Sequence, residues 1–454
     1  MAKGKKKENL TPEERLQAAL VPDWEQPYKV PENWCWTYLG IVSDIVTGGT
    51  PSKKNPEYYG GTFPFFKPSD LDSGRHVVQA SEYLSDEGKS VSRIIPEQST
   101  AVCCIGTIGK SGFLEVSGTT NQQINSAIPK FNPLHLYYFC NTNFFVDELW
   151  KKASATTISI VNKSKMESCI FPLSPLPEQQ RIVDRIEILF AKLDEAKQKA
   201  QDALDSFETR KAAILHKAFT GELTARWRKE HGVGMESWDK TILKNVCKVN
   251  PKKTDTNGLP DDLEVSFFPM ASLSEIYGEI TEPQTRLLKD VKNGFTNFSE
   301  GDIVFAKITP CMENGKSAII GKLVNGIGYG TTEFYVLRCS ENLYNRYLYH
   351  MVRDTSFRNK AKAVMSGAVG QQRVPKSFME NYPLNLPSVP EQTEIVRILD
   401  DLLAKEQQAK EAAEAVLEQI DLMKKSILAR AFRGELGTND PSEESAVELV
   451  KKII

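Results

Sequence analysis

Two Gly-Lys-Ser triplets, at residues 109–111 and 315–317, come nearest to a catalytic motif in this chain. A phosphate-binding loop needs a further glycine five positions before the triplet, so that successive backbone N–H groups can wrap the phosphates. Those positions hold Cys104 and Pro310, and the proline also removes a backbone donor. The triplets therefore do not predict a nucleotide site.

Motifs for other chemistry are also missing. Methyl transfer to a base amino group uses an Asn/Asp-Pro-Pro-aromatic tetrapeptide, which does not occur here. A metal-dependent nuclease needs paired carboxylates and a lysine around one cation, and the nearest match, Asp23 with Glu87 and Lys89, is too widely spread. The five histidines show no metal-ligand spacing. The sequence predicts no catalytic residue and no metal site, although a site assembled from distant residues stays open.

Polar and basic residues interleaved with aromatic ones remain, and they suit contact with DNA. Lys and Ser reach phosphates, whereas Asn and Gln can pair bidentately with adenine. In the first half of the chain the candidate DNA-binding residues are Thr50, Ser52, Lys53, Lys54, Tyr58, Lys67, Ser69, Asn121, Gln122 and Gln123. In the second half they are Lys252, Lys253, Lys307, Thr309, Asn314, Lys316, Thr331, Gln371, Gln372 and Arg373. An ordinary solvated loop would show the same residue types.

The charge balance limits how DNA could be held. The net charge is −2, and residues 34–170 hold 12 basic and 12 acidic residues, against 19 and 17 in residues 232–388. Binding by bulk electrostatics needs a clearly basic surface. Any DNA contact must therefore be local, or the phosphate charge must be neutralised partly by another subunit.

The bulk composition places the chain among ordinary globular proteins. Its 454 residues exceed what one hydrophobic core usually holds, so two or three domains are expected. No apolar stretch is long enough to cross a membrane, and the N-terminus lacks the apolar region of a secretory signal. Eight cysteines without a CxxC motif fit a reducing compartment. We expect a cytoplasmic protein that contacts no membrane.

A long segment occurs twice and organises the rest of the chain. Residues 176–223 align with residues 389–436 without a gap, and 20 of the 48 positions are identical. Each copy opens with Pro-Glu-Gln and ends with Gly-Glu-Leu. A proline and an acidic residue suit a helix start, and a glycine suits a helix end. Each copy is therefore predicted to form a helical rod.

Both copies carry apolar residues at alternating spacings of four and three, which is typical of a coiled-coil seam. Arg210 interrupts the first seam and Glu406 the second. These opposite charges could help to fix the register, although their positions along the two copies differ. The residues predicted for the seam and for docking of partners are Ile182, Ile186, Leu189, Leu193, Phe207, Ile214, Ile395, Leu399, Leu402, Ile420, Met423 and Ile427.

The repeat divides the chain into six predicted parts. The segments between the copies are rich in Gly, Pro, aromatic and β-branched residues, which favours mixed, mainly β domains. An N-terminal extension at 1–33 begins with a Thr-Pro helix start at Thr11. The other predicted parts are a first domain at 34–175, a helical region at 176–223, a linker with the second domain at 224–388, a second helical region at 389–436 and a tail at 437–454.

This pattern resembles the specificity subunits of type I restriction-modification systems over nearly the whole chain. The resemblance rests on the twin Pro-Glu-Gln openings followed by Ile-Val and on the twin Ala-Phe-x-Gly-Glu-Leu endings. The stretch Leu-Thr-Ala-Arg-Trp-Arg at 223–228 is also similar. The resemblance implies an α+β fold, in which two mixed, mainly β target recognition domains are separated by two long α-helices that form an antiparallel coiled coil.

The resemblance also implies a role in phage defence. Each domain would read one half of a bipartite, asymmetric sequence in double-stranded DNA, and the helices would set the gap between the halves. Two modification subunits carrying S-adenosylmethionine would dock on the helices, and restriction subunits using ATP and Mg²⁺ would join them. The chain itself would bind no cofactor and do no chemistry. The alternatives are an autonomous DNA-modifying enzyme and a coiled-coil adaptor that binds only proteins.

Overall fold

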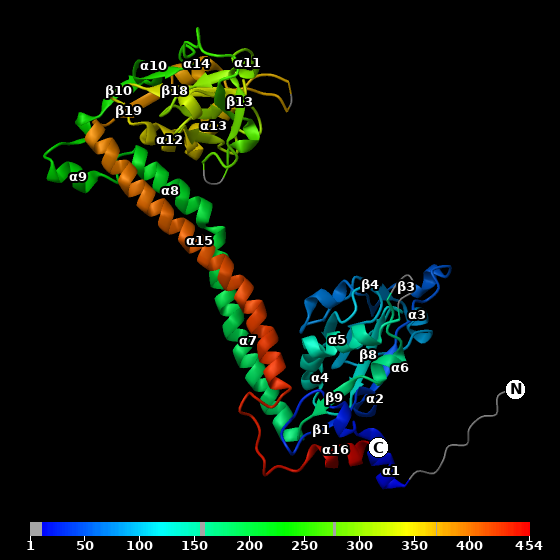
Figure 1. Ribbon diagram of the computed structural model, residues 1–454. Helices are drawn as coiled ribbons and strands as arrows, with labels where there is room; N and C mark the ends of the chain where they lie inside the picture. The colour runs from blue at the N-terminus through cyan, green and yellow to red at the C-terminus, as the bar shows by residue number, and fades with distance from the viewer. Residues whose placement is uncertain (1–10, 155–158, 276–277, 369) are drawn as a thin grey trace. The chain divides into compact units, whose positions relative to one another are not determined.

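The computed structural model describes residues 11–154, 159–275, 278–368 and 370–454. It divides into two compact units (Figure 1): unit 1 comprises Met1–Ala200 and Ala415–Ile454, and unit 2 comprises Gln201–Glu414. Each unit contains one sheet-rich domain, part of the first copy of the repeat and part of the second. The chain is therefore built twice, and each half uses helices from both copies.

The sheet domain of unit 1 contains three small sheets. Their strand orders are β2-β8-β5-β6, β4-β3-β7 and β1-β9. All pairs are antiparallel except β3 with β7. The strands are β1 (Cys35–Tyr38), β2 (Ser43–Thr47), β3 (Tyr59–Phe66), β4 (Glu82–Leu84), β5 (Ser99–Cys103), β6 (Ser111–Leu114), β7 (Thr119–Thr120), β8 (Ile124–Pro129) and β9 (Ile170–Leu173).

Short helices cover these sheets and close the unit. They are α1 (Pro12–Ala19), α2 (Leu39–Val42), α3 (Asp86–Ser90), α4 (Pro133–Cys140), α5 (Asn143–Lys152), α6 (Lys163–Glu167) and α16 (Ala446–Ile453). The predicted helix start at Thr11 is confirmed by two reciprocal hydrogen bonds. The Thr11 hydroxyl accepts from the Glu14 backbone N–H at 3.2 Å, and the Glu14 carboxylate accepts from the Thr11 backbone N–H at 2.7 Å. The C-terminal α16 contacts α1 and α2 (Figure 1).

Unit 2 repeats the same plan. Its sheets have the orders β11-β18-β15-β16, β13-β12-β17-β14 and β10-β19, and β12 with β17 is again a parallel pair. The strands are β10 (Asp239–Ile242), β11 (Cys247–Val249), β12 (Glu264–Phe268), β13 (Gln284–Leu287), β14 (Thr296–Phe298), β15 (Ile303–Ala306), β16 (Ser317–Ile319), β17 (Gly328–Gly330), β18 (Phe334–Cys339) and β19 (Pro383–Leu386). Its short helices are α9 (Ala225–Glu230), α10 (Leu243–Val246), α11 (Leu288–Val291), α12 (Asn345–Arg353), α13 (Thr355–Ala363) and α14 (Lys376–Glu380).

The first copy of the repeat forms two helices, α7 (Leu176–Asp205) and α8 (Phe207–Phe219), whereas the second forms a single helix, α15 (Val389–Ala431). The break falls at Ser206, whose hydroxyl donates to the Asp202 carbonyl at 2.8 Å. Such back-bonding bends helices, and Asp and Ser are poorer helix formers than the Glu and Gln that stand at the aligned positions of α15.

Ion pairs show that the two copies run antiparallel. In unit 1, Asp194 of α7 pairs with Lys424 of α15 at 2.5 Å, and Lys197 pairs with Asp421 at 3.8 Å. In unit 2, Arg210 Nε of α8 donates to Glu406 Oε2 of α15 at 2.8 Å. In these pairs the residue number in α15 falls as the residue number in the first copy rises. The two seam interruptions therefore meet, and the predicted antiparallel coiled coil is confirmed.

The seam itself differs from the predicted one in α15. Ile395, Leu399 and Ile420 are buried as expected, but Met423 is 47% exposed. Val416, which the same spacing places in the seam, is 40% exposed, whereas Leu417 is half-buried. Between the buried residues Ala413 and Ile420, the side chain turned towards the seam is therefore Leu417, one residue later than the sequence pattern predicts. The assignment of Met423 to the seam is wrong.

The ends of the helices belong to the cores of the sheet domains. Ile182 and Ile186 of α7 and Phe432, just after α15, pack into the main core of unit 1 with residues of β9 and α4. Ile395 and Leu399 of α15 pack in the same way into the main core of unit 2. These four isoleucine and leucine side chains are fully buried. They hold the chain to itself and present no surface to a partner.

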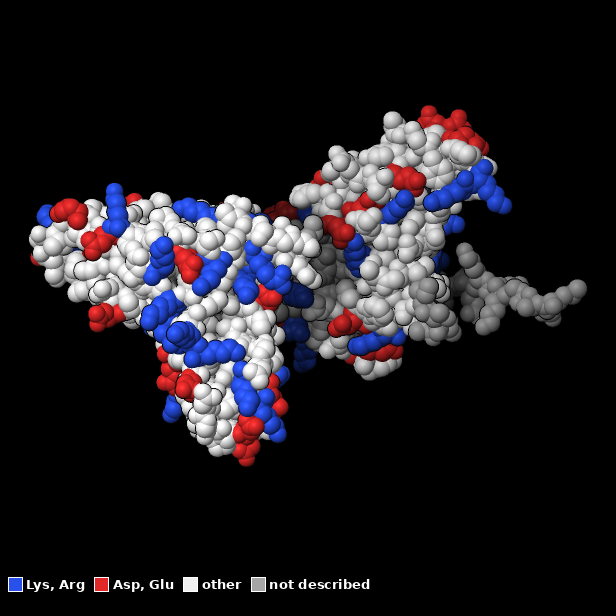
Figure 2. Space-filling view, turned by 90° about the horizontal axis from the view of Figure 1, so that it is seen from above, with Lys and Arg blue, Asp and Glu red and all other residues white. Residues whose placement is uncertain are grey.

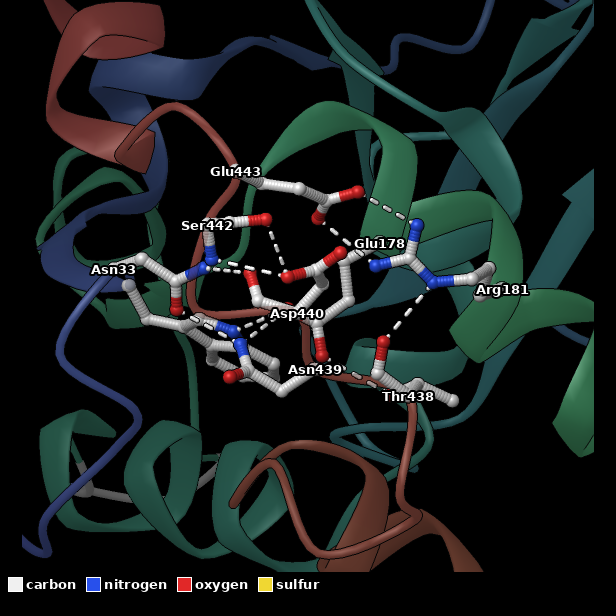
Figure 3. Close-up of polar contacts among 9 residues, drawn as sticks. Asn33, Glu178, Arg181, Thr438, Asn439, Asp440, Ser442 and Glu443 are labelled. Carbon is white, nitrogen blue, oxygen red and sulfur yellow. Dashed lines mark hydrogen bonds and ion pairs between the residues drawn. The ribbon is translucent and has the colours of Figure 1, made fainter.

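The Pro-Glu-Gln motif has a clear structural role in unit 1. Glu178 is fully buried, and its Oε2 accepts from the Trp34 indole N–H at 2.7 Å. The same carboxylate accepts from Asn439 Nδ2 at 2.8 Å and from the Thr438 hydroxyl at 3.1 Å. One buried carboxylate thus joins the start of the sheet domain, the start of α7 and the C-terminal tail (Figure 3).

A second contact fastens the tail beside Glu178. The Arg181 guanidinium forms a fork with Glu443, at 2.7 and 2.8 Å, and its Nε donates to the Thr438 carbonyl at 3.0 Å (Figure 3). Asn33 Nδ2 donates to the Asp440 carbonyl at 2.9 Å. The tail is therefore a built-in part of unit 1.

The second Pro-Glu-Gln motif forms the equivalent contact in unit 2 with different partners. Glu391 is 1% exposed and accepts from the Trp238 indole N–H at 2.9 Å and from the Thr224 hydroxyl at 2.7 Å. Here an arginine also enters, because Arg228 Nη1 donates to Glu391 Oε1 at 2.6 Å. The carboxylate of unit 2 is thus paired with a buried cation, whereas that of unit 1 accepts only from neutral donors.

We expect replacement of these glutamates by glutamine to have unequal effects. Glu178→Gln turns an amide donor towards neutral donors and should lower the free energy of unfolding by about 1–3 kcal/mol. Glu391→Gln also deprives buried Arg228 of its counter-charge and should cost about 3–5 kcal/mol. Denaturant titrations of the full chain measure both, with Glu195→Gln and Glu411→Gln on exposed helix positions as controls. Equal losses at Glu178 and Glu391 would contradict this account.

The contact between Arg210 and Glu406 should show energetic coupling. Both side chains are partly exposed, so a double-mutant cycle with leucine at each position should give a coupling of about 0.2–1 kcal/mol. The double variant should be at least as stable as either single variant, because two leucines extend the apolar seam. Thermal unfolding of the four proteins gives the answer, and additive effects would remove the contact as a register device.

Candidate nucleic-acid interface

In unit 1 the strands bring two of the predicted DNA-binding segments together at one end of the sheet domain. The loop after β2 is fixed to the turn between β7 and β8, because the Gly49 N–H donates to the Thr120 carbonyl at 2.8 Å and the Thr50 hydroxyl contacts Gln122 Oε1. A Cβ at Gly48 would lie 2.1 Å from the Asn121 carbonyl oxygen. Only glycine permits this close approach.

Within this turn the amides have different roles. Asn121 is buried, its Nδ2 donates to Gln123 Oε1 at 2.9 Å, and its Oδ1 accepts from the Gln123 N–H at 3.1 Å. The Asn121 amide therefore shapes the turn. Gln122 is exposed at the tip of the turn. It is the residue of the three whose side chain is open to a ligand.

The other candidates of unit 1 lie around this turn. Lys67 follows Phe66, whose carbonyl accepts from the Asn121 N–H at 3.1 Å, but the Lys67 ammonium already pairs with Glu82 at 2.9 Å. Ser52, Lys53 and Lys54 are exposed in the loop after β2. Half-buried Tyr58 ends the same loop, and exposed Ser69 follows Lys67 in the next one.

Unit 2 gathers more of the predicted residues at the corresponding end. Arg373 forms a fork with Glu333, with Nη2–Oε1 at 2.8 Å and Nε–Oε2 at 2.9 Å. This hydrogen bonding holds the pKa of the Glu333 carboxyl below its ordinary value. The Thr309 N–H donates to the Gln372 carbonyl at 3.0 Å, and the Thr331 hydroxyl accepts from the Glu333 N–H at 3.2 Å. Glu333 is not among the predicted site residues, because cations and amides are the groups expected to contact phosphates and bases.

The remaining candidates of unit 2 are placed differently. Asn314 Nδ2 donates to Glu275 at 3.0 Å, and Lys316 Nζ lies 3.7 Å from the same carboxylate. Lys253 Nζ donates to the Lys292 carbonyl at 3.2 Å. Lys252 and Gln371 are exposed in their loops. The contacts of Asn314 and Lys316 therefore tie them to Glu275 and not to the Arg373–Glu333 pair.

The two ends share one backbone frame. The Gln123 carbonyl accepts from the Cys104 N–H at 2.7 Å, as the Glu333 carbonyl accepts from the Lys307 N–H at 2.9 Å. The Cys104 carbonyl in turn accepts from the Val161 N–H, as the Lys307 carbonyl accepts from that of Val374, both at 2.9 Å. These bonds identify the structurally equivalent positions of the two domains.

Different side chains occupy the equivalent positions. A bridge joins Ile105 to Ile160 in unit 1, and its counterpart joins Ile308 to Arg373 in unit 2. Ile160 is 42% exposed, so an apolar side chain stands where unit 2 has a guanidinium. The sequence could not show this equivalence, because aligning the Gly-Lys-Ser triplets matches Cys104 with Pro310, three residues beyond Lys307. One frame thus presents two different chemical surfaces.

The surface charge is mixed, as the composition predicts. Figure 2 shows acidic and basic side chains interspersed over much of the face it presents, with Lys and Arg gathered in a local band. Among the residues that the structure describes, no cluster of three or more His, Cys, Asp or Glu is placed to hold a metal ion. In the same residues no helix has the length and apolar character to cross a membrane.

Known proteins with similar sequences are specificity subunits. The EcoAI specificity subunit of Escherichia coli is 34% identical over 260 residues, which cover 48% of this chain and 44% of that protein. The chain therefore aligns with less than half the length of this relative. The StySPI specificity subunit of Salmonella potsdam is 22% identical over 456 residues, covering 94% of this chain and 96% of that protein.

The fold is also found among solved structures. The HsdS subunit from Thermoanaerobacter tengcongensis matches 91% of this chain and 100% of its own, with a TM-score of 0.64 and 20% identity. The family model described as the type I restriction modification DNA specificity domain matches residues 31–204 and 235–419, one match for each sheet domain with the adjoining helix. On this double match, the chain belongs to the type I restriction-modification DNA specificity family.

Proposed function

We propose that the chain is the DNA sequence-specificity subunit of a type I restriction-modification complex. The observation that carries this proposal is the shared backbone frame of the two sheet domains. Lys307, Glu333 and Arg373 stand on it in unit 2, whereas in unit 1 the same positions hold buried Cys104, half-buried Gln123 and exposed Ile160. Two readers with the same backbone and different side chains suit a bipartite site with unlike halves. Each domain then reads one half.

The helices hold the readers and dock the modification subunits in this proposal. Tied to a helical strut, two readers lose little orientational freedom on binding, so the second half-site is engaged at high effective concentration. Exposed apolar residues on α15, among them Leu422 and Met423, and Ile188 on α7 offer docking contacts. The chemistry lies with the partners: S-adenosylmethionine in the modification subunits, and ATP and Mg²⁺ in restriction subunits. The chain is then a non-catalytic subunit that works on double-stranded DNA in the cytoplasm.

Exchange of one sheet domain tests this division of labour. Replacing residues 34–170 by the corresponding domain of another family member should change one half of the methylated sequence and leave the other half and the spacing intact, because each unit has its own core. Methylome sequencing of cells that carry the reconstituted complex reads out both halves. A change in both halves, or in neither, would refute the proposal.

The exposed loop after β2 should contribute phosphate contacts. Lys53→Ala combined with Lys54→Ala should weaken DNA binding by the assembled complex and reduce its salt slope by about two, roughly one for each lost contact. Lys451→Ala with Lys452→Ala, exposed on α16 of the same unit, is the matched control. Binding isotherms at several salt concentrations give the slopes. If the slope is unchanged, these lysines belong to an ordinary solvated loop.

A further inference from the structure

A pocket of about 230 Å³ lies within unit 2 between the repeat helices and the sheet domain. Lys211 of α8 and Lys410 of α15 line one side, and Arg353 of α12 and Arg358 of α13 line the other. Glu208 and Glu275 are the carboxylates in its wall. Four basic side chains and two carboxylates thus line one concave space, and Lys410 also lies 3.9 Å from Glu414.

Backbone carbonyls accept hydrogen bonds from both guanidinium groups. Arg358 Nη1 donates to the Glu313 carbonyl at 2.5 Å, and its Nε donates to the Arg353 carbonyl at 3.2 Å. Arg353 Nη1 donates to the Gly315 carbonyl at 3.1 Å. Backbone carbonyls fix the direction of a guanidinium but leave its positive charge in place. Of the two carboxylates, Glu275 is shared with Asn314 and Lys316.

Lys211 is the least satisfied of these cations. Its side chain is half-buried, and within the described part of the chain its ammonium has no hydrogen-bond or ion-pair partner. Burial lowers the pKa of Lys211, nearby Glu208 opposes this, and Arg353, Arg358 and Lys410 lower it further. Burial likewise lowers the pKa of Arg358, and Arg353 adds to the effect. Partial burial of an ammonium that has no hydrogen-bond or ion-pair partner is unfavourable.

A larger cavity of about 1020 Å³ adjoins this pocket and shares Phe207, Lys211 and Arg353 with it. Glu279, Asp400 and Glu406 are the carboxylates in its wall. Asp400 is paired with Arg346 at 2.7 Å and lies 2.9 Å from His350 Nε2, and Glu406 is paired with Arg210 at 2.8 Å. The ring of Tyr349 and that of Phe207 also line this cavity. The cavity therefore has room for an organic group attached to whatever occupies the cationic pocket.

We propose that this pocket of unit 2 binds a phosphate group, with Lys211 as a direct ligand and Arg353 and Arg358 beside it. A phosphate carries enough charge to answer several cations at once, and guanidinium and ammonium groups are its usual protein ligands. The bound group would bridge α8 and α15 to α12 and α13. It would thus tie the sheet domain of unit 2 to the helices that carry it.

The decisive variant is Lys211→Met, which keeps the apolar stem and removes the charge. Lys217→Met, exposed on the same helix, is the matched control. Titration of the full-length protein with sodium pyrophosphate at constant ionic strength should show saturable binding to the wild type and to Lys217→Met. For Lys211→Met the dissociation constant should rise at least about tenfold, the equivalent of one lost charge-assisted contact.

Thermal unfolding provides an independent measurement, because the variant that weakens pyrophosphate binding should raise the stability of the ligand-free protein. Without pyrophosphate, Lys211→Met should unfold at a higher temperature than the wild type, because a partly desolvated charge among other cations has been removed. With pyrophosphate the wild type should gain stability and the variant should not. Unchanged pyrophosphate binding by Lys211→Met, no binding by the wild type, or a lower unfolding temperature of the ligand-free variant would each overturn the proposal.

Competition with duplex DNA identifies the source of the phosphate. If the site takes a DNA backbone phosphate, pyrophosphate should compete with the duplex, and Lys211→Met should lower the salt slope of DNA binding by about one. If the site takes a free phosphate compound, duplex binding should be unaffected by either change. Both results are consistent with a phosphate site and differ only in what delivers the ligand.

Discussion

A buried carboxylate that accepts a hydrogen bond from a tryptophan indole holds each unit together. Glu178 with Trp34 and Glu391 with Trp238 join the first strand region of a sheet domain to the helix that follows that domain. Each carboxylate also binds the segment that follows the other copy of the repeat, through Thr438 in unit 1 and Thr224 in unit 2. Because an unpaired buried charge is expensive, three distant segments must come together wherever this glutamate is buried.

This arrangement explains how the two sheet domains can differ at one end and still share a scaffold. The core residues and the glutamate contacts lie where the sheet domain meets the helices. The loops that share the frame around Cys104 and Lys307 are supported by backbone hydrogen bonds, which do not depend on side-chain identity. Side chains such as Ile160 and Arg373 can therefore differ without disturbing the fold. A change of recognition chemistry is then compatible with an unchanged scaffold.

The helices show how far a periodic pattern constrains packing. Ile182, Ile186, Ile395 and Leu399 are buried because the sheet domains cover them as well as the opposite helix. Farther along, only two helices meet and alanines are frequent. There the contact with the partner helix decides which of two neighbouring residues is buried. Glu406 faces Arg210 there, and the half-buried Leu417 replaces the expected Val416. A heptad pattern predicts a seam but not its local phase.

The sequence by itself determined the duplication, the two long helical segments with their apolar seams and the resemblance to the family, because repeated motifs and helical periodicity are local properties of the chain. The antiparallel pairing was implied only by that resemblance, and the ion pairs of the structure show it. It also singled out Gln122, Thr309 and Arg373 as candidate DNA-binding residues in loops. Only the tertiary structure decided that Asn121 shapes a turn, that Glu333 pairs with Arg373, and that Ile160 is the counterpart of Arg373. Burial, pairing and equivalence depend on segments far apart in sequence. The loop between β15 and β16 is also longer than the loop between β5 and β6, so equivalent residues of the two domains do not keep a constant offset in sequence.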